Sequence, residues 1–247
     1  MMRVRSAVAA GVFAVGMAGC ALLKPTPTPL RTEVFEPGAS DADEYALLLP
    51  GRGGHPRDFA RAGLTDTLRA SGFRGEIVGA DAHIAYYFKR TVIARVREDV
   101  VAQRPGRRPW IVGVSMGGLG ALLYEKTHPG EAAGLVLLAP YLGEAAIISE
   151  IRAAGGLAGW DPGEIAPDDF QRELWLWIKH GGLDRVPVFI AWGRDDEFHA
   201  ANALLAERLP PGRVAVLDGG HLWSVWGPAF QALLERGACG PRVSDAR

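Results

Sequence analysis

Short apolar runs alternate with amphipathic stretches along most of the chain. The runs are rich in Leu, Val and Ile and stop at Pro, Gly or Asp, which is typical of strands buried on both faces of a parallel sheet. The predicted strands are Tyr45–Leu49, Glu76–Ala80, a strand that begins at Trp110, Leu135–Ala139, Val186–Trp192 and Val214–Leu217, with a short edge strand over Arg31–Glu36.

The stretches between these strands have helical spacing. Val92, Val96 and Val100 recur four residues apart with charged residues between them, as in a helix that buries one face. Strands that alternate with helices in this way predict an α/β fold in one domain, with a mostly parallel, doubly wound sheet and helices on both faces. The predicted helices are Asp58–Ala70, Tyr86–Gln103, Met116–Lys126, Ala200–Leu209 and Trp223–Glu235.

Residues 141–182 interrupt the alternation. They contain two helix-like segments, Glu144–Ala154 and Asp168–Lys179, around a Gly-rich turn. This insertion is expected to form a small helical cap. Its second segment contains Trp175 and Trp177. We expect these two side chains to pack between the cap and the core; the alternative is that they line a substrate pocket.

Composition and net charge indicate a globular protein and argue against nucleic-acid binding. The 247 residues are 48% hydrophobic and 22% charged, which are ordinary values for a globular protein. Twenty-seven basic and 28 acidic residues give a net charge of -1, so no positive field indicates a nucleic-acid partner.

The N-terminus differs from the rest of the chain. Arg3 and Arg5 precede a small-residue apolar stretch, Ala7–Ala18, which predicts an export signal over residues 1–19. The sequence Met17-Ala18-Gly19-Cys20 resembles the lipobox of bacterial lipoproteins, in which the cysteine is lipidated. An uncleaved anchor helix and an ordinary signal peptide are the alternatives.

The lipoprotein resemblance implies export and attachment to the bacterial cell envelope through Cys20, at the outer membrane where one exists. Residues 20–43 are then a linker, in which Lys24–Pro29 predicts a stiff, solvated polyproline spacer or a disordered leader. The α/β domain is expected over residues 44–238, with the insertion at about 141–182, and a tail over 239–247. With Cys20 lipidated, Cys239 has no disulfide partner, and neither cysteine has metal-ligand spacing.

The strand that begins at Trp110 runs into Gly113-Val114-Ser115-Met116-Gly117. A G-x-S-x-G sequence is weak evidence by itself in a chain with 32 glycines, but between a strand and a helix it predicts a sharp turn that exposes a nucleophilic serine. A helix cap is the alternative use of this serine.

Other polar residues follow later strands. Asp195 and Asp196 come after the strand that ends at Trp192, and His221 comes after the last strand. Carboxyl ends of parallel strands share one edge of the sheet, where ligands bind. Histidine can take the serine proton, and a carboxylate can orient the imidazole.

With these motifs in the order Ser, Asp, His, the chain resembles the α/β-hydrolase superfamily from about Tyr45 to Glu235. The resemblance implies catalytic Ser115, Asp196 and His221, with Asp195 as the alternative acid. It also implies an oxyanion hole from the N–H groups of Met116 and Arg52. Pro50 stands where family members often have histidine.

The resemblance implies hydrolysis of a carboxylic ester through an acyl-enzyme, without metal or organic cofactor. The expected partner is a small-molecule ester or lipid-like substrate. A thioesterase, a lactonase and an amidase or peptidase on the same fold are alternatives, as is a non-catalytic lipoprotein that binds in the envelope.

Overall fold

A computed structural model describes residues 24–240. The predicted export signal, Cys20 and nearly all of the C-terminal tail lie outside the described residues. The centre is a seven-stranded sheet in the order β1-β3-β2-β4-β5-β6-β7. Only β1 is antiparallel to its neighbour. The strands are β1 (Thr32–Glu36), β2 (Glu44–Leu49), β3 (Ile77–Ala80), β4 (Arg108–Val114), β5 (Gly134–Leu138), β6 (Val188–Gly193) and β7 (Val214–Leu217).

The inner strands are buried along almost their whole length, which confirms the predicted parallel sheet covered on both faces. Their registers also align the carboxyl ends. Leu49 of β2 is level with Gly113 of β4, and Val114 is level with Leu138 of β5. Residues that follow these strands therefore meet at one edge, which we call the carboxyl edge.

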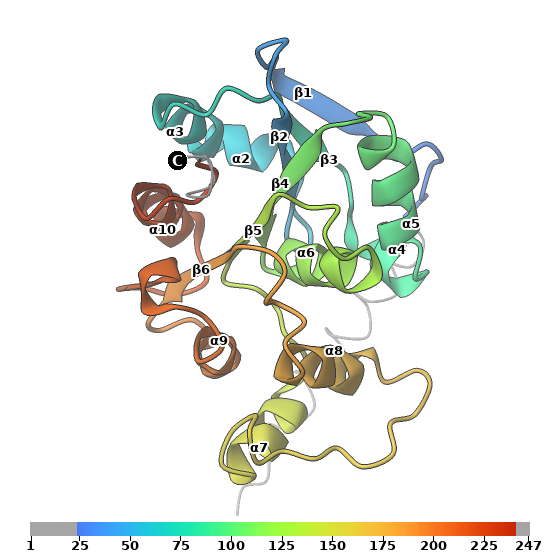
Figure 1. Ribbon diagram of the computed structural model, residues 1–247, viewed down its shortest axis with the longest axis vertical. Helices are drawn as coiled ribbons and strands as arrows, with labels where there is room; N and C mark the ends of the chain where they lie inside the picture. The colour runs from blue at the N-terminus through green and yellow to red at the C-terminus, as the bar shows by residue number, and fades with distance from the viewer. Residues whose placement is uncertain (1–23, 241–247) are drawn as a thin grey trace, which may run out of the picture.

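Helices cover both sides of the sheet. Figure 1 shows α3 and α10 to the left of the strands and α5 and α6 to the right. The helices are α2 (Arg57–Arg61), α3 (Leu64–Ala70), α4 (Ile84–Phe88), α5 (Val92–Val96), α6 (Met116–Thr127), α7 (Ala145–Ala153), α8 (Phe170–Lys179), α9 (His199–Ala206) and α10 (Trp223–Glu235), with a π-helix over Arg97–Val101 and a 3-10 turn over Pro211–Arg213.

Two predicted helices are divided in the structure. The segment 58–70 breaks into α2 and α3 at Gly63, whose φ is 76°. The segment 86–103 breaks between α4 and α5 at Arg90, whose φ is 55°. A residue in the left-handed region cannot continue a right-handed helix, so local apolar spacing alone overestimated both lengths.

The insertion between β5 and β6 forms α7 and α8, which lie beyond the sheet at the lower end of Figure 1. Trp175 is fully buried and donates a hydrogen bond from Nε1 to the Leu142 carbonyl, 2.9 Å away. Lys126 of α6 forms a 3.0 Å ion pair with Glu173 of α8. These contacts agree with the packing role predicted for Trp175 and attach the insertion to the domain.

The leader, residues 24–30, differs from the solvated spacer that its composition predicts. The carbonyl groups of Pro25 and Pro27 bond to His83 and Tyr86, and Leu30 is buried. None of the helices between residues 24 and 240 is long and apolar enough to span a bilayer.

Candidate active site

Ser115 lies in a strained turn between β4 and α6. Its φ is 53° and its ψ is -115°, a conformation that costs energy for a residue with a side chain. Backbone hydrogen bonds hold it there: the Ser115 N–H donates to Leu138, and the Ser115 carbonyl accepts from Tyr141. The hydroxyl makes no capping bond to α6, so the helix-cap alternative does not describe this serine.

Glycines make the turn sterically feasible. A Cβ on Gly113 would lie 2.3 Å from the Gly117 carbonyl oxygen, and one on Gly117 would lie 2.0 Å from the Leu49 oxygen. Both distances are far below van der Waals contact. On the other side, a Cβ on Gly51 would lie 3.2 Å from Cβ of Ser115, so the Gly-rich turn after β2 leaves space beside the serine.

Asp196 and His221 come together from the ends of β6 and β7. Asp196 Oδ2 lies 2.8 Å from Nδ1 of His221, and its Oδ1 accepts a 2.8 Å bond from the Phe198 N–H. The Asp196 side chain is fully buried, whereas Asp195 is exposed. Asp196 is therefore the carboxylate that contacts the imidazole.

Aromatic rings surround His221 at right angles to its plane. The Phe198 and Trp226 rings lie 5.0 and 4.7 Å from the imidazole between centroids. Tyr141 packs edge-on against Phe198 at 5.4 Å. Sequence reasoning missed these rings, because they belong to separate elements and no motif marks their contact.

Ser115 and His221 share the carboxyl edge. The structure, which describes residues 24–240, shows no hydrogen bond between their side chains. Tyr141 connects the two residues, because its N–H bonds to Ser115 and its ring packs on Phe198, which contacts His221. The geometry therefore places the predicted Ser, His and Asp residues at the same edge of the sheet, with Asp196 and His221 in contact.

The two predicted oxyanion donors are next in sequence to Ser115 and to Gly51. Met116 is the first residue of α6, a position whose N–H has no carbonyl partner within the helix. Arg52 directly follows Gly51, which faces Ser115. Burial and the bond to Glu144 raise the pKa of Tyr141, and the Arg52 charge opposes that rise, which places Arg52 near the start of the insertion.

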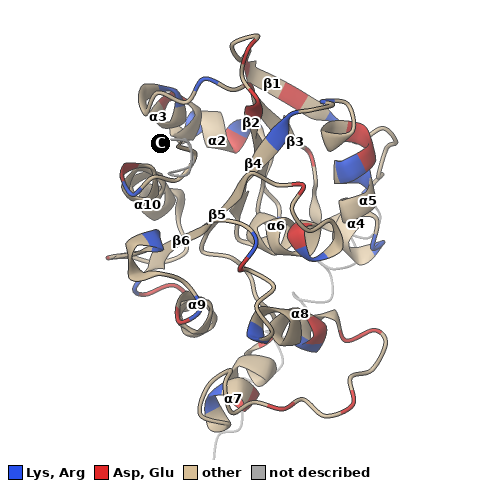
Figure 2. Ribbon diagram, in the orientation of Figure 1, with Lys and Arg blue, Asp and Glu red and all other residues tan. Residues whose placement is uncertain are grey.

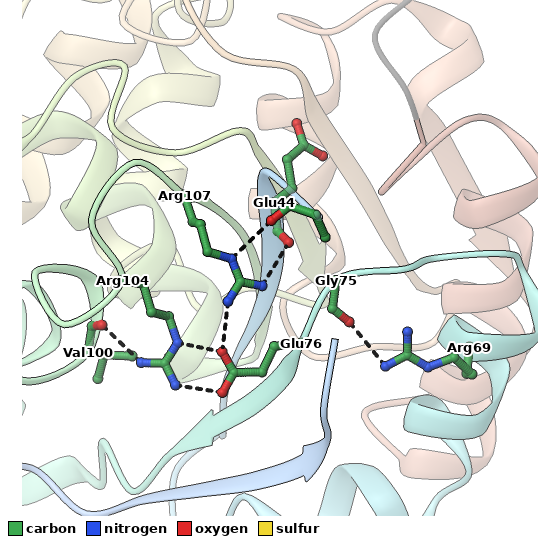
Figure 3. Close-up of polar contacts among 8 residues, drawn as sticks. Glu44, Arg69, Gly75, Glu76, Val100, Arg104 and Arg107 are labelled. Atoms are coloured by element: carbon green, nitrogen blue, oxygen red, sulfur yellow. Dashed lines mark hydrogen bonds and ion pairs between the residues drawn. The ribbon is translucent and has the colours of Figure 1, made fainter. Parts of the chain in front are cut away.

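A separate cavity of about 430 Å³ opens at the opposite end of β4. Its lining includes Arg97, Arg104, Arg107 and Glu131. Figure 3 shows Arg104 and Arg107 bonded to Glu76. None of the predicted site residues lines this cavity, so the chemistry is assigned to the carboxyl edge.

Comparison with known proteins gives one family match within the chain. The profile of the family described as "Serine aminopeptidase, S33" matches residues 87–168, about a third of the chain. The matched part contains Ser115 and ends before Asp196. No curated protein sequence matches the chain significantly.

Solved structures match over most of the chain. A ferulic acid esterase is 19% identical, with a TM-score of 0.54 over 81% of this chain and 86% of that one. Est1E from Butyrivibrio proteoclasticus is 20% identical, with a TM-score of 0.54 over 84% and 95%. The S-formylglutathione hydrolase FrmB from Staphylococcus aureus is 15% identical, with a TM-score of 0.55 over 86% and 98%.

The chain has the α/β-hydrolase fold. In this fold the nucleophile turn follows a central strand, and the acid and the histidine follow later strands. Ser115 after β4, Asp196 after β6 and His221 after β7 occupy these places. The α/β-hydrolase fold thus explains why residues so far apart in the sequence share one edge of the sheet.

Proposed function

We propose that this protein is a serine hydrolase that cleaves carboxylic esters through an acyl-enzyme. The 2.8 Å contact between buried Asp196 and His221, at the same edge as the strained Ser115 turn, carries the proposal. The fold is shared with the ferulic acid esterase and Est1E, which supports hydrolysis of an ester bond.

The first half of the reaction acylates the serine. With Nδ1 of His221 bonded to Asp196, Nε2 accepts the Ser115 proton while Oγ attacks the ester carbonyl. The N–H groups of Met116 and Arg52 donate to the oxyanion that forms. The imidazolium then gives its proton to the leaving alkoxide, the C–O bond breaks, and the alcohol departs.

The second half returns the enzyme to its starting state. Water gives a proton to Nε2 of His221 and attacks the acyl carbonyl, and the second tetrahedral intermediate uses the same N–H donors. Its collapse breaks the bond to Oγ, and the imidazolium reprotonates Ser115 as the carboxylic acid leaves. Each turnover consumes one ester and one water, and no cofactor takes part.

Labelling with a fluorophosphonate probe tests the nucleophile. We expect covalent labelling of the purified full chain and none of Ser115→Ala, whereas Ser149→Ala, an exposed serine of α7, labels like the wild type. A folded wild-type chain that does not label would favour a non-catalytic binding protein. Nitrophenyl esters and acyl thioesters of graded chain length then separate esterase from thioesterase activity.

We also propose that the chain is exported and lipid-anchored through Cys20, which lies outside the described residues. The Met17–Cys20 sequence supports this proposal. Bacteria grown with a labelled fatty acid should incorporate label into the wild type and not into Cys20→Ser. Equal incorporation in both would reject the anchor without affecting the proposed hydrolysis.

A further inference from the structure

The leader is attached to one side of α4. Nε2 of His83 lies 3.2 Å from the Pro25 carbonyl oxygen, and the Tyr86 hydroxyl donates a 2.8 Å bond to the Pro27 carbonyl. Nζ of Lys89 donates to Oγ1 of Thr26 at 2.9 Å. Leu30, at the end of the leader, is buried in the domain, with only 3% of its surface exposed. Residues 25–30 therefore have a fixed path on the domain.

This path enters the domain at the carboxyl edge. Thr32, the first residue of β1, is level with Ala80, the last residue of β3. The next residue of that loop, Asp81, donates its N–H to the Arg31 carbonyl at 2.8 Å. Helix α4 follows the same end of β3 and lies on the right of Figure 1, beside α6. The leader and the catalytic residues thus share one edge of the sheet.

The surface around this entry is basic and carries an exposed aromatic ring. We define the basic corner as Lys24, Arg31, Phe88, Lys89 and Arg90, all of which are exposed. Phe88 is 49% exposed, and Figure 2 shows basic residues at the end of α4. Among residues 24–240, no acidic side chain forms an ion pair with any of these four cations.

Two of the three nearby acidic groups pair with cations outside the corner. Asp99 accepts from the Leu30 N–H and pairs with Arg95 at 3.2 Å. Oδ1 of Asp81 is buried. Glu33 pairs with Arg57 at 2.8 Å. An exposed ring among unpaired cations fits a surface of anionic lipid, because the cations attract the head groups and the ring enters the interface.

Other exposed apolar side chains lie at the same edge. The large apolar residues with the highest exposure include Phe170, at the start of α8, and Leu222, directly after His221, at 40% and 59%. Besides these two and Phe88, the exposed large apolar residues are Val34 and Val216, which belong to the edge strands β1 and β7. The carboxyl edge therefore has apolar groups at several places around the site.

We infer that the basic corner contacts an anionic lipid bilayer and holds the catalytic edge of the domain toward the membrane. The inference rests on the proposed lipid anchor. Three residues lie between Cys20 and Lys24, so the four steps along the chain span at most about 14 Å when extended. A lipid on Cys20 therefore keeps the bilayer beside α4, because the leader cannot swing away from its contacts with His83 and Tyr86.

Depth measurements on spin labels test this orientation independently of catalysis. The full lipidated chain is reconstituted in vesicles of equal parts phosphatidylcholine and phosphatidylglycerol, with a nitroxide on Phe88→Cys or on Ala102→Cys. Ala102 is exposed and precedes β4, at the opposite end of the sheet. The remaining thiol, Cys239, is buried.

We expect the Phe88 label to collide more with oxygen than with a water-soluble nickel chelate, and the Ala102 label to do the reverse. Adding Arg90→Ser to Phe88→Cys should lower the ratio of membrane-bound to water-exposed corner about fivefold, since one cation near the head groups contributes roughly that factor. Raising the salt concentration should act in the same direction.

Equal collision ratios at the two positions on a lipidated chain would overturn the orientation and leave the proposed hydrolysis intact. Shielding of the Phe88 label in native membranes but not in pure lipid would also overturn it, in favour of a protein partner. If the chain produced in bacteria carries no lipid on Cys20 and does not bind the vesicles, both the anchor and the orientation are overturned. Fluorophosphonate labelling of the same samples reports the proposed function separately.

Discussion

Oδ2 of Asp196 lies 2.8 Å from Nδ1 of His221, and no part of the Asp196 side chain is exposed to solvent. A buried carboxylate at this distance fixes the imidazole tautomer and stabilises the imidazolium that forms when the histidine takes a proton. The neighbouring carboxylate of Asp195 is exposed and can do neither.

Replacing these two acids in turn tests their roles. For Asp196→Asn we expect kcat on a nitrophenyl ester to fall by about 10⁴, because the amide favours the wrong tautomer. Asp195→Asn should keep kcat within about threefold, as expected for an exposed side chain away from the chemistry. Similar losses in both variants would mean that the loop, and not the buried contact, is essential.

The rings beside His221 are expected to position it. Phe198→Ala removes the face that packs 5.0 Å from the imidazole, so kcat should fall about 10- to 100-fold with little change in KM. Phe198→Tyr keeps the ring and should recover most of the rate. A Phe198→Ala variant that changes KM alone would place this ring in substrate binding instead.

The close packing of the Ser115 turn makes Gly117 sensitive to substitution. A Cβ there would lie 2.0 Å from the Leu49 carbonyl oxygen, so Gly117→Ala should lower the free energy of unfolding by about 3 kcal/mol or more. Gly212→Ala is the matched control, because nothing lies within 4 Å of its Cβ position. Urea denaturation measures both, and equal stabilities would contradict the close approach of Gly117 to the end of β2.

The ion pair at the opposite end of the sheet gives a pH-dependent prediction (Figure 3). Arg104 bonds both carboxylate oxygens of Glu76, at 2.7 and 2.9 Å, and lowers the Glu76 pKa below its ordinary value of 4.5 despite burial. The stabilisation is therefore present above pH 4.5 and is lost as the pH falls through the lowered folded-state pKa.

For Glu76→Gln we expect the free energy of unfolding to fall by about 2 kcal/mol at neutral pH. The difference from wild type should shrink as the pH falls below the ordinary carboxyl range. Urea denaturation at several pH values measures it. Glu235→Gln, at an exposed residue that forms no ion pair within residues 24–240, should show no such trend. A difference that is independent of pH would contradict the proposed linkage.

Much of the fold could be predicted because its signals are local. Apolar runs such as Leu135–Ala139, which are short and end at Pro or Gly, favour buried strands. Their alternation with amphipathic segments favours a parallel sheet with helices on both sides. The same periodicity could not reveal the breaks at Gly63 and Arg90. A single backbone angle ends a helix there, and apolar spacing carries no information on that angle.

The sequence by itself determined the central strand with its serine turn and the order in which Asp196 and His221 follow later strands, because residue type and strand ends are properties of short segments. Only the tertiary structure decided that Asp196 and not Asp195 faces His221, since that depends on the path of a loop between two strands. It also decided that Phe198 and Trp226 enclose the imidazole and that the leader lies on α4. These are contacts between distant elements, whose free energy comes from burial and hydrogen bonding in the assembled domain and leaves no local pattern in the chain.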